Sequence, residues 1–483
     1  MRKIKTIIDR LSLPVKCSLA YMFSSILVSG LSFLTMPIFT RILSTEEMGI
    51  VTTFSSWQTI LSAIVTLSLG SASYSVAMVE FKEERDKYDS AVLTLSCLSC
   101  VFFLLVYLCF QHAWNALLGL NSNLIIIMFA SFFVTPAMTF WMSRQRYEFK
   151  YRPLLIVSIS SAIISTASSV AFVLIERNNG SIDLGTVKIL GKMIPELLIS
   201  ACLYMLIMHN GRCFVSRKYW VFSLKLSIPL IVHSLSKHIL DTSDRIMIDH
   251  FWGKSEVGIY GVLYTISTLS IIVWSAINAS LIPVMFDKLH NNQGKDINNI
   301  IKPLILVYGI LSCFLSLLSP EIVHIIAPEE YYSAIYIMPP IASGIFLTSL
   351  YTIFGNYLTF YKKTNLIMIS TFFAALINVV LNYIFIPLYG SIAASYTTLI
   401  AYVFLAIFQF FSAKHICGKD FLDSRFLILG SIFTLCWCLI CNLMYKVTII
   451  RYCVFIIILF LIVIKRRMIL SAIMPSFRVR TDK

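Results

Sequence analysis

Fourteen apolar runs, most of them about 20 residues long, follow one another along the chain with short polar connections. A helix needs roughly 20 apolar residues to cross about 30 Å of hydrocarbon, so each run predicts a membrane-spanning helix. The composition agrees, because 58% of the residues are hydrophobic, 13% are charged and the mean hydropathy is +0.83. A soluble domain carries about a quarter charged residues. We predict an all-α integral membrane protein.

The predicted helices number 12 to 14, because the last run is short and the seventh is interrupted by charges. Their approximate boundaries are 17–38, 50–78, 91–110, 123–143, 154–175, 187–208, 222–248, 257–285, 301–318, 333–360, 366–388, 392–413, 426–445 and 449–464.

Short sequence matches recur in the same order about 210 residues apart. Residues 47–50 (Glu-Met-Gly-Ile) return as 256–259 (Glu-Val-Gly-Ile), and 180–182 (Gly-Ser-Ile) return as 390–392. Phe149, followed by a basic cluster, returns as Phe360 with Lys362 and Lys363. Three matches in register indicate an internal duplication, which is typical of a carrier whose halves rock around a central site.

The duplication predicts two six-helix repeats followed by a C-terminal helix pair. The N-terminal half should span 1–210 and the C-terminal half 211–420. The helix pair and a basic cytoplasmic tail should occupy 421–483.

Basic residues in the connections predict the orientation. With the N-terminus in the cytoplasm, the connections and tails on that side carry 29 of the 39 lysine and arginine residues, and the opposite connections carry five. Such a bias follows the positive-inside rule for an even number of spans, so we expect both termini in the cytoplasm. The first apolar run is too long for a removable export signal and should remain as the first helix.

Several functional classes are not expected. The net charge of +15 is explained by the basic connections, so we expect no nucleic-acid partner. The clustered cysteines lie in apolar runs without histidine or carboxylate neighbours, which predicts neither a metal site nor a disulfide scaffold. The segment from Gly185 to Lys192 lacks the spacing and the Ser or Thr of a phosphate loop, so no nucleotide or other cofactor is expected.

Charged residues concentrate in the sixth and seventh runs. Lys188, Lys192 and Glu196 recur every fourth residue and therefore share one helix face. A charge at the hydrocarbon centre costs on the order of 2.5 to 3.5 kcal/mol, so such a face should line a protein or water-filled lumen. The seventh run carries a similar set: Lys225, His233, Lys237, Asp241, Asp244 and Arg245.

The two faces together carry five cations and three carboxylates, and this surplus of positive charge favours an anion. Phosphate or pyrophosphate on a lipid carrier would also explain why the site must be reached from within the membrane. Lys188, Lys192 and Lys237 are the candidate point charges for a phosphoryl group.

A structural interpretation of the same residues stays open. Lys192 can pair with Glu196, and Lys237 with Asp241, as internal ties. Lys225 and Arg245 can reach the two membrane surfaces.

The second half offers polar side chains for a sugar path, although tyrosines also anchor helices at membrane interfaces. Among them, Asn378 and Asn382 are candidate substrate-binding residues. Asp241 and Asp244 are candidates for ion coupling, because the protonation of an intramembrane carboxylate can change as the lumen opens to either side. The full polar set of the second half is Tyr351, Asn356, Tyr357, Asn378, Asn382, Tyr383 and Tyr396.

Residues 37–49 (Pro-Ile-Phe-Thr-Arg-Ile-Leu-Ser-Thr-Glu-Glu-Met-Gly) resemble the opening of bacterial polysaccharide flippases of the multidrug/oligosaccharidyl-lipid/polysaccharide exporter superfamily. Residues 244–248 and 253–260 look like the start of that family's second half, and 378–394 look like its eleventh and twelfth spans. Ile392 departs from the family's frequent second glycine. Arg41, within the first segment, joins the candidate substrate-binding residues.

The resemblance implies a transporter of the inner (cytoplasmic) membrane, not an enzyme. Its expected substrate is an undecaprenyl-pyrophosphate-linked oligosaccharide, such as an O-antigen or capsule repeat unit of lipopolysaccharide or polysaccharide biosynthesis, moved from the cytoplasmic to the outer leaflet. The expected partners are this lipid-linked oligosaccharide, membrane lipid, a glycan polymerase and a chain-length regulator.

Two alternatives remain open. A drug or cation exporter of the same superfamily would share the fold, but its lumen should be rich in carboxylates. A membrane glycan polymerase or ligase would handle the same carrier, but such an enzyme usually needs a sizeable outer loop, and the outer connections here are about a dozen residues or shorter.

Overall fold

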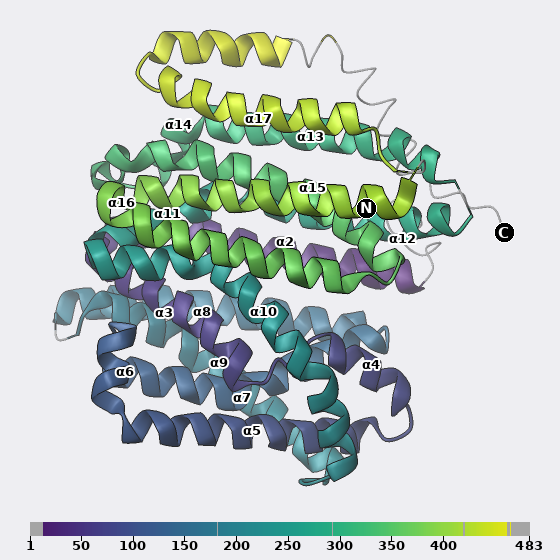
Figure 1. The fold of residues 1–483 in the computed structure, drawn as a ribbon. Helices are drawn as coiled ribbons and strands as arrows, with labels where there is room; N and C mark the ends of the chain where they lie inside the picture. The colour runs from purple at the N-terminus through teal and green to yellow at the C-terminus, as the bar shows by residue number, and fades with distance from the viewer. Residues whose placement is uncertain (1–12, 181, 292, 419–420, 461–463, 465–483) are drawn as a thin grey trace, which may run out of the picture. The chain divides into compact units, whose positions relative to one another are not determined.

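The computed structural model describes residues 13–180, 182–291, 293–418, 421–460 and 464. The basic C-terminal tail, Ser181 of the second repeat match and part of the fourteenth run lie outside the described residues. Helices dominate the described chain, which contains no strand (Figure 1).

The first part of the chain, up to Trp252, consists of helices connected by short turns. They are α2 (Leu13–Ile42), α3 (Thr45–Val65), α4 (Ala72–Glu80), α5 (Arg85–Cys109), α6 (Gln111–Leu118), α7 (Ser122–Tyr147), α8 (Tyr151–Asn179), α9 (Leu184–Gly211) and α10 (Arg217–Trp252).

The second part continues in the same way and ends in a helix at Thr448–Phe460. Its other elements are α11 (Lys254–Ser267), α12 (Ser270–His290), η1 (Gly294–Asp296), α13 (Ile297–Leu317), α14 (Ser319–Ile326), η2 (Glu329–Ile337), α15 (Met338–Phe360), α16 (Thr364–Cys417) and α17 (Ser424–Met444).

Eleven helical segments of the described chain are long and apolar enough to cross a membrane. One of them, the 54-residue α16, is two helices joined at Gly390, where φ is 62° and ψ is −145°. The charge-rich α10 and the shorter Thr448–Phe460 account for the remaining two predicted runs. The prediction of an all-α membrane protein with 12 to 14 spans is confirmed.

The second predicted run differs from a continuous helix. It is broken after α3, where Leu67 and Ser68 have positive φ angles of 53° and 46°. The Oγ of Ser68 donates to Ala63 O at 3.1 Å, and Thr66 Oγ1 donates to Ser62 O at 2.7 Å. Hydroxyl groups that bond to nearby carbonyls compete with the helix ladder, and an apolar pattern alone does not reveal this break.

The chain forms two compact units, Met1–Gly258 and Ile259–Lys483. The boundary lies beyond the repeat boundary predicted near residue 210, because α10 packs on α3, α4 and α5 of the first unit. The repeat boundary describes the duplication of sequence, whereas this boundary describes contacts.

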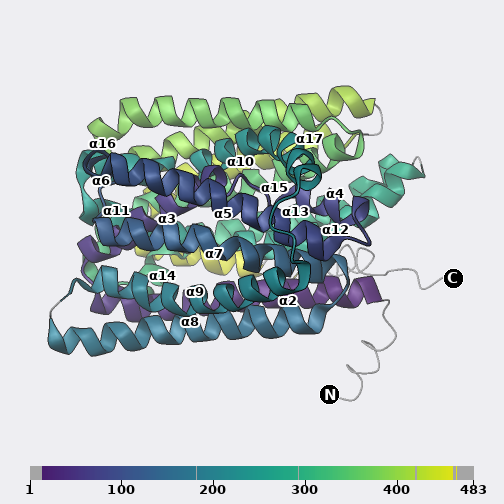
Figure 2. The same ribbon diagram turned by 90° about the horizontal axis from the view of Figure 1, so that it is seen from below.

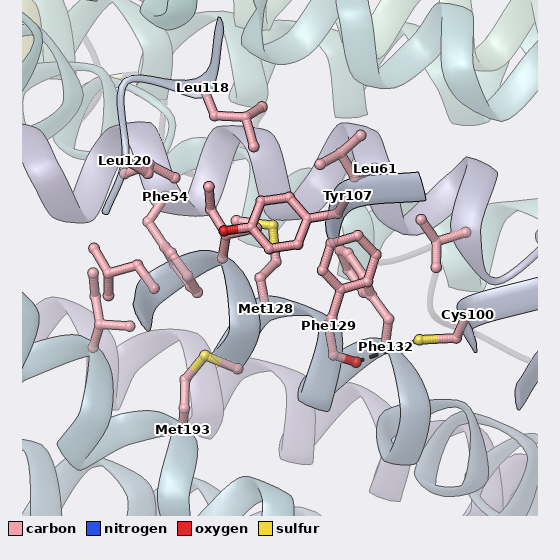
Figure 3. Packing of buried hydrophobic residues seen from close by; sticks show 14 residues of the cluster. Phe54, Leu61, Cys100, Tyr107, Leu118, Leu120, Met128, Phe129, Phe132 and Met193 are labelled. Carbon is pink, nitrogen blue, oxygen red and sulfur yellow. Dashed lines mark hydrogen bonds between the residues drawn. The ribbon is translucent and has the colours of Figure 1, made fainter. Parts of the chain in front are cut away.

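The core of the first unit is an apolar cluster shared by α3, α5, α7 and α9 (Figure 3). Figures 1 and 2 show α5 and α7 running side by side, and Cys100 Sγ of α5 donates to Phe129 O of α7 at 3.4 Å. Phe54 and Met193 reach the same cluster from α3 and α9. This packing fixes α9, which carries three of the eight predicted charges.

The second unit is built around α15, most of which is buried. The helices α12, α13, α16 and α17 pack against it. The C-terminal pair is joined to this core, because Trp437 Nε1 of α17 donates to Cys313 O of α13 at 3.3 Å.

The turn between α7 and α8 and the turn between α15 and α16 have the same backbone. The middle of their three residues has a positive φ, 56° at Phe149 and 58° at Lys362. The N–H of the third residue bonds to a carbonyl five residues back, at 2.9 Å from Lys150 and 2.7 Å from Lys363. The structure therefore equates Phe149 with Lys362, two residues away from the Phe360 match that the sequence predicts.

Candidate functional site

Asp183 caps α9 and fixes where its charged face begins. Its carboxylate accepts hydrogen bonds from the backbone N–H groups of Gly185 and Thr186, at 2.9 and 3.2 Å. These bonds satisfy donors that a helix start leaves open. Glu47 of α3 adds a second link, because its Oε1 accepts a bond from Leu184 N at 2.9 Å. The first turn of α9 is therefore anchored to α3.

Lys188 lies one turn further along α9, among apolar partners. Its Nζ is 4.1 Å from the ring centroid of Phe39 in α2 and 3.4 Å from Met48 Sδ in α3. A cation over an aromatic face is stabilised by the ring quadrupole. In the described chain no carboxylate forms a salt bridge with Lys188, so its ammonium group keeps N–H donors for an anion.

Lys192 and Glu196 are not joined by a salt bridge among the described residues. Lys192 is exposed and Glu196 is half-buried on the same face of α9. The structural interpretation that pairs these two residues is therefore wrong for this structure, in which Lys192 makes no salt bridge with Glu196.

The predicted residues of α10 follow one another over three turns. Lys237 is exposed and makes no salt bridge within the described chain, so the predicted tie to Asp241 is absent. His233 is half-buried, and its Nδ1 has no hydrogen-bond partner among the described residues. Asp244 is fully buried, and its Oδ1 accepts a bond from Arg245 N at 2.8 Å.

The helix α3 packs against both α9 and α10. Lys188 and Lys192 are brought together one turn apart on α9, and Lys237 belongs to the other helix that flanks α3. Arg41 is exposed at the end of α2, two residues after the Phe39 ring that covers Lys188. The candidate cations of the first unit thus lie on α2, α9 and α10.

Asn378 and Asn382 are placed differently from the predicted sugar path. Both are fully buried in α16. Asn382 Nδ2 donates to Asn378 Oδ1 at 3.0 Å, and Asn378 Nδ2 donates to Thr398 Oγ1 at 3.3 Å. Thr397 Oγ1 donates to Asn382. These bonds tie the two segments of α16 together, so neither amide is open to a substrate in this structure.

A reciprocal contact between α3 and α11 was not predicted, although both of its halves belong to the duplicated motif. A Cβ added to Gly49 would lie 1.9 Å from Lys254 O, and a Cβ added to Gly258 would lie 2.0 Å from Thr45 O. Beside them, Thr45 Oγ1 and Ser255 Oγ are 2.7 Å apart. Only glycine allows the backbones to approach so closely.

An ionic network at the other end of the first unit was also missed. Arg144 Nη1 lies 2.5 Å from Asp86 Oδ1 and 3.1 Å from Asp89 Oδ2, and its Nε lies 2.9 Å from Glu148 Oε1. Asp89 is 1% exposed and also accepts a hydrogen bond from Tyr74 OH at 2.7 Å. The available signal was the pair of acids three residues apart at the start of the third apolar run.

Comparison with known proteins decides the family. Residues 15–290, more than half of the chain, match the family model described as "Polysaccharide biosynthesis protein". The chain belongs to this family. Residues 229–384 also match the model "MatE". The predicted resemblance to polysaccharide flippases of the multidrug/oligosaccharidyl-lipid/polysaccharide exporter superfamily is confirmed.

One curated relative is the "Probable low-salt glycan biosynthesis flippase Agl15" of Haloferax volcanii, 23% identical over 178 residues. The match covers 36% of this chain and 37% of that protein, so the chain spans just over a third of its relative.

Among solved structures, "Lipid II flippase MurJ, inward closed conformation" aligns with a TM-score of 0.68, 18% identity, and coverage of 94% of this chain and 100% of that one. A multidrug resistance MATE family transporter in an inward-facing conformation aligns with a TM-score of 0.54 at 13% identity, over 84% of this chain and 95% of that one. These likenesses establish the fold.

Proposed function

We propose that the protein flips an undecaprenyl-pyrophosphate-linked oligosaccharide, such as an O-antigen or capsule repeat unit, from the cytoplasmic to the outer leaflet. It acts by alternating access through a cationic lumen lined by α9 and α10, in the inner membrane, with both termini in the cytoplasm. It is a transporter and performs no covalent chemistry. A glycan polymerase and a chain-length regulator are its proposed partners.

One observation carries the proposal: Lys188 and Lys192 on α9, an apolar helix long enough to cross a membrane, and Lys237 on the charge-rich α10 have no carboxylate partner in the described chain. Unpaired charges are costly in hydrocarbon and usually mark a substrate path. Since the charges are positive, the fitting ligand is an anion, and a pyrophosphate offers several oxygens to separate lysines. Membership in a polysaccharide biosynthesis family supports the glycan.

The binding residues that we propose are the predicted cations, without the two buried asparagines of α16. Lys188, Lys192 and Lys237 are their centre, and Arg41 serves as an outer cation. Asn378 and Asn382 remain candidates only for another conformation, because their amides are occupied here. Ion coupling through Asp241 and Asp244 likewise remains a proposal.

The experiment is a flipping assay in proteoliposomes with a labelled undecaprenyl-pyrophosphate sugar. The parent protein should move it, and variants Lys188→Gln, Lys192→Gln and Lys237→Gln should be slower by about tenfold or more, since each removes one charge-assisted contact. The matched control is Lys225→Gln, which removes an exposed lysine near the start of the same helix α10 and should retain the parent rate. Equal loss in the control would contradict the proposed site.

The MatE match and the MATE-like fold favour a second candidate, an exporter of cationic drugs. The two functions differ in the sign of the cargo. An exporter of this kind should move an organic cation in the same proteoliposomes, and removing the three lysines should speed that transport by removing repulsion. No cation transport is expected under our proposal.

A further inference from the structure

Residues 146–152 at the turn between α7 and α8 read Arg-Tyr-Glu-Phe-Lys-Tyr-Arg, so that aromatic residues alternate with charged ones, mostly cationic. Arg146, Phe149 and Arg152 are exposed. We call the set Tyr21, Arg146, Phe149, Tyr151 and Arg152 the α7–α8 patch. The distribution of basic residues predicts that this end of the first unit faces the cytoplasm.

Phe149 is an exposed aromatic residue in a strained turn. Its φ of 56° lies in the left-handed region, which an L-residue with a large side chain rarely adopts. Cys17 Sγ of α2 donates to Phe149 O at 3.2 Å and fixes the turn against the first span. The residue is 45% exposed. An aromatic ring held out beside cations at a membrane surface is suited to the interface between headgroups and acyl chains.

Both arginines of the patch lie over aromatic rings. The Cζ of Arg146 is 5.8 Å from the Tyr21 ring centroid, and that of Arg152 is 6.0 Å from the Tyr151 ring centroid. Neither forms a salt bridge within the described chain. Arg144, two residues before Arg146, behaves differently, because three carboxylates surround it. The inward arginine is thus neutralised by the protein, and the outward ones are not.

We propose that the α7–α8 patch binds the headgroups of anionic phospholipids in the leaflet that it faces. The stacked guanidinium groups of Arg146 and Arg152 present paired N–H donors, which match phosphate oxygens. The Phe149 ring inserts among the first carbons of the acyl chains. The proposal does not depend on which cargo the protein moves.

The second unit supplies a matched control. The turn with Lys362 and Lys363 has the same backbone and two exposed lysines, but a lysine replaces the outward aromatic ring. Removing both lysines changes the net charge as much as removing both arginines does. Comparing the two double variants therefore distinguishes binding at the α7–α8 patch from a general effect of lost positive charge.

The test uses the full chain in detergent, titrated with phosphatidylglycerol and with phosphatidylcholine, and reads bound lipid by native mass spectrometry. The parent should prefer phosphatidylglycerol. The double variant Arg146→Gln, Arg152→Gln should weaken that binding about thirtyfold, because each basic residue contributes about fivefold at an anionic surface. The control Lys362→Gln, Lys363→Gln should bind nearly as the parent does. Phe149→Asn, which tolerates the left-handed backbone, should weaken the binding of both lipids.

Three results would overturn the proposal. They are equal binding of the two lipids by the parent, equal loss in the lysine control, and displacement of phosphatidylglycerol by undecaprenyl pyrophosphate, which would assign the patch to the transported lipid. If the glutamine variant does not purify in one oligomeric state, Arg146→Lys, Arg152→Lys decides. Partial loss supports the proposal, because lysine lacks the planar fork, and unchanged binding contradicts it.

Discussion

Arg144 is a single side chain that joins the start of α5 to the end of α7 in the first unit. It contacts Asp86 and Asp89 at the start of α5 and Glu148 after α7. We expect Arg144→Gln to lower the free energy of unfolding by about 3 to 5 kcal/mol, because it leaves the buried Asp89 without its cation. Denaturant unfolding in detergent measures this, with Arg146→Gln as a control that should change stability by less than about 1 kcal/mol.

Two carboxylates at this end of the first unit, Glu84 and Glu148, predict that the protein loses stability at low pH. A hydrogen bond from Lys218 lowers the pKa of Glu84 below its ordinary value of 4.5. Burial raises the pKa of Glu148, but hydrogen bonds from Lys150 and Arg144 outweigh it and lower the pKa. A carboxyl group with a lower pKa in the folded state contributes stability that is complete above the unfolded pKa and is lost as the pH falls through the folded value.

We therefore expect these two carboxylates to lower the Tm in detergent progressively below about pH 4.5. Glu148→Gln, which removes one titrating group, should reduce the size of that fall. A stability that rises on acidification through this range would show that the two carboxylates are not stabilised by their partners.

Because Lys192 and Lys237 have no carboxylate partner in the described chain, we expect their loss to impair transport without reducing stability. Replacing Lys192 and Lys237 by alanine in one chain should abolish most export and leave the free energy of unfolding within about 0.5 kcal/mol, because neither residue has a carboxylate to leave unpaired. Surface polysaccharide and protein abundance in the membrane measure the two effects. Normal polysaccharide in the double variant would contradict the role of these cations.

The starts of α3 and α11 form a contact inside the first compact unit, and we propose that this contact opens during transport. The hydroxyl oxygens of Thr45 and Ser255 are 2.7 Å apart. We expect cysteines at both positions to form a disulfide that stops transport, and a reductant to restore it. Each single cysteine variant should transport normally. A cross-linked protein that transports at the parent rate would show that this contact does not open.

Reporter fusions can test the membrane topology of the full chain. Reporter fusions within residues 144–152 and at Lys483 should report the cytoplasm, and a fusion at Glu329 should report the outside, because of the lysine and arginine bias. Glu329 begins η2, which follows α14 in the second unit. An outside signal at Lys483 would require an odd number of spans.

The span count was predictable because long apolar runs have few alternatives to a helix in a membrane. The break after Val65 was not, since it depends on hydroxyl-to-carbonyl bonds at Thr66 and Ser68 that leave no mark in the hydropathy. The positions of the lysines followed from helical spacing. Their lack of carboxylates did not, because pairing is decided by side-chain direction as well as by sequence distance.

The contact at Gly49 and Gly258 also bears on how such a chain could arise. Each glycine packs against the carbonyl oxygen of the first residue of the other helix. Gly49 packs against Lys254 O, and Gly258 packs against Thr45 O. This mutual exchange is the property of an isologous interface, in which one surface recognises a copy of itself. A six-helix ancestor bearing such a surface would pair as a homodimer before any gene fusion. Under the predicted duplication, a fusion would free each glycine motif to change separately, and Met48 and Val257 are the position at which the two matched segments differ.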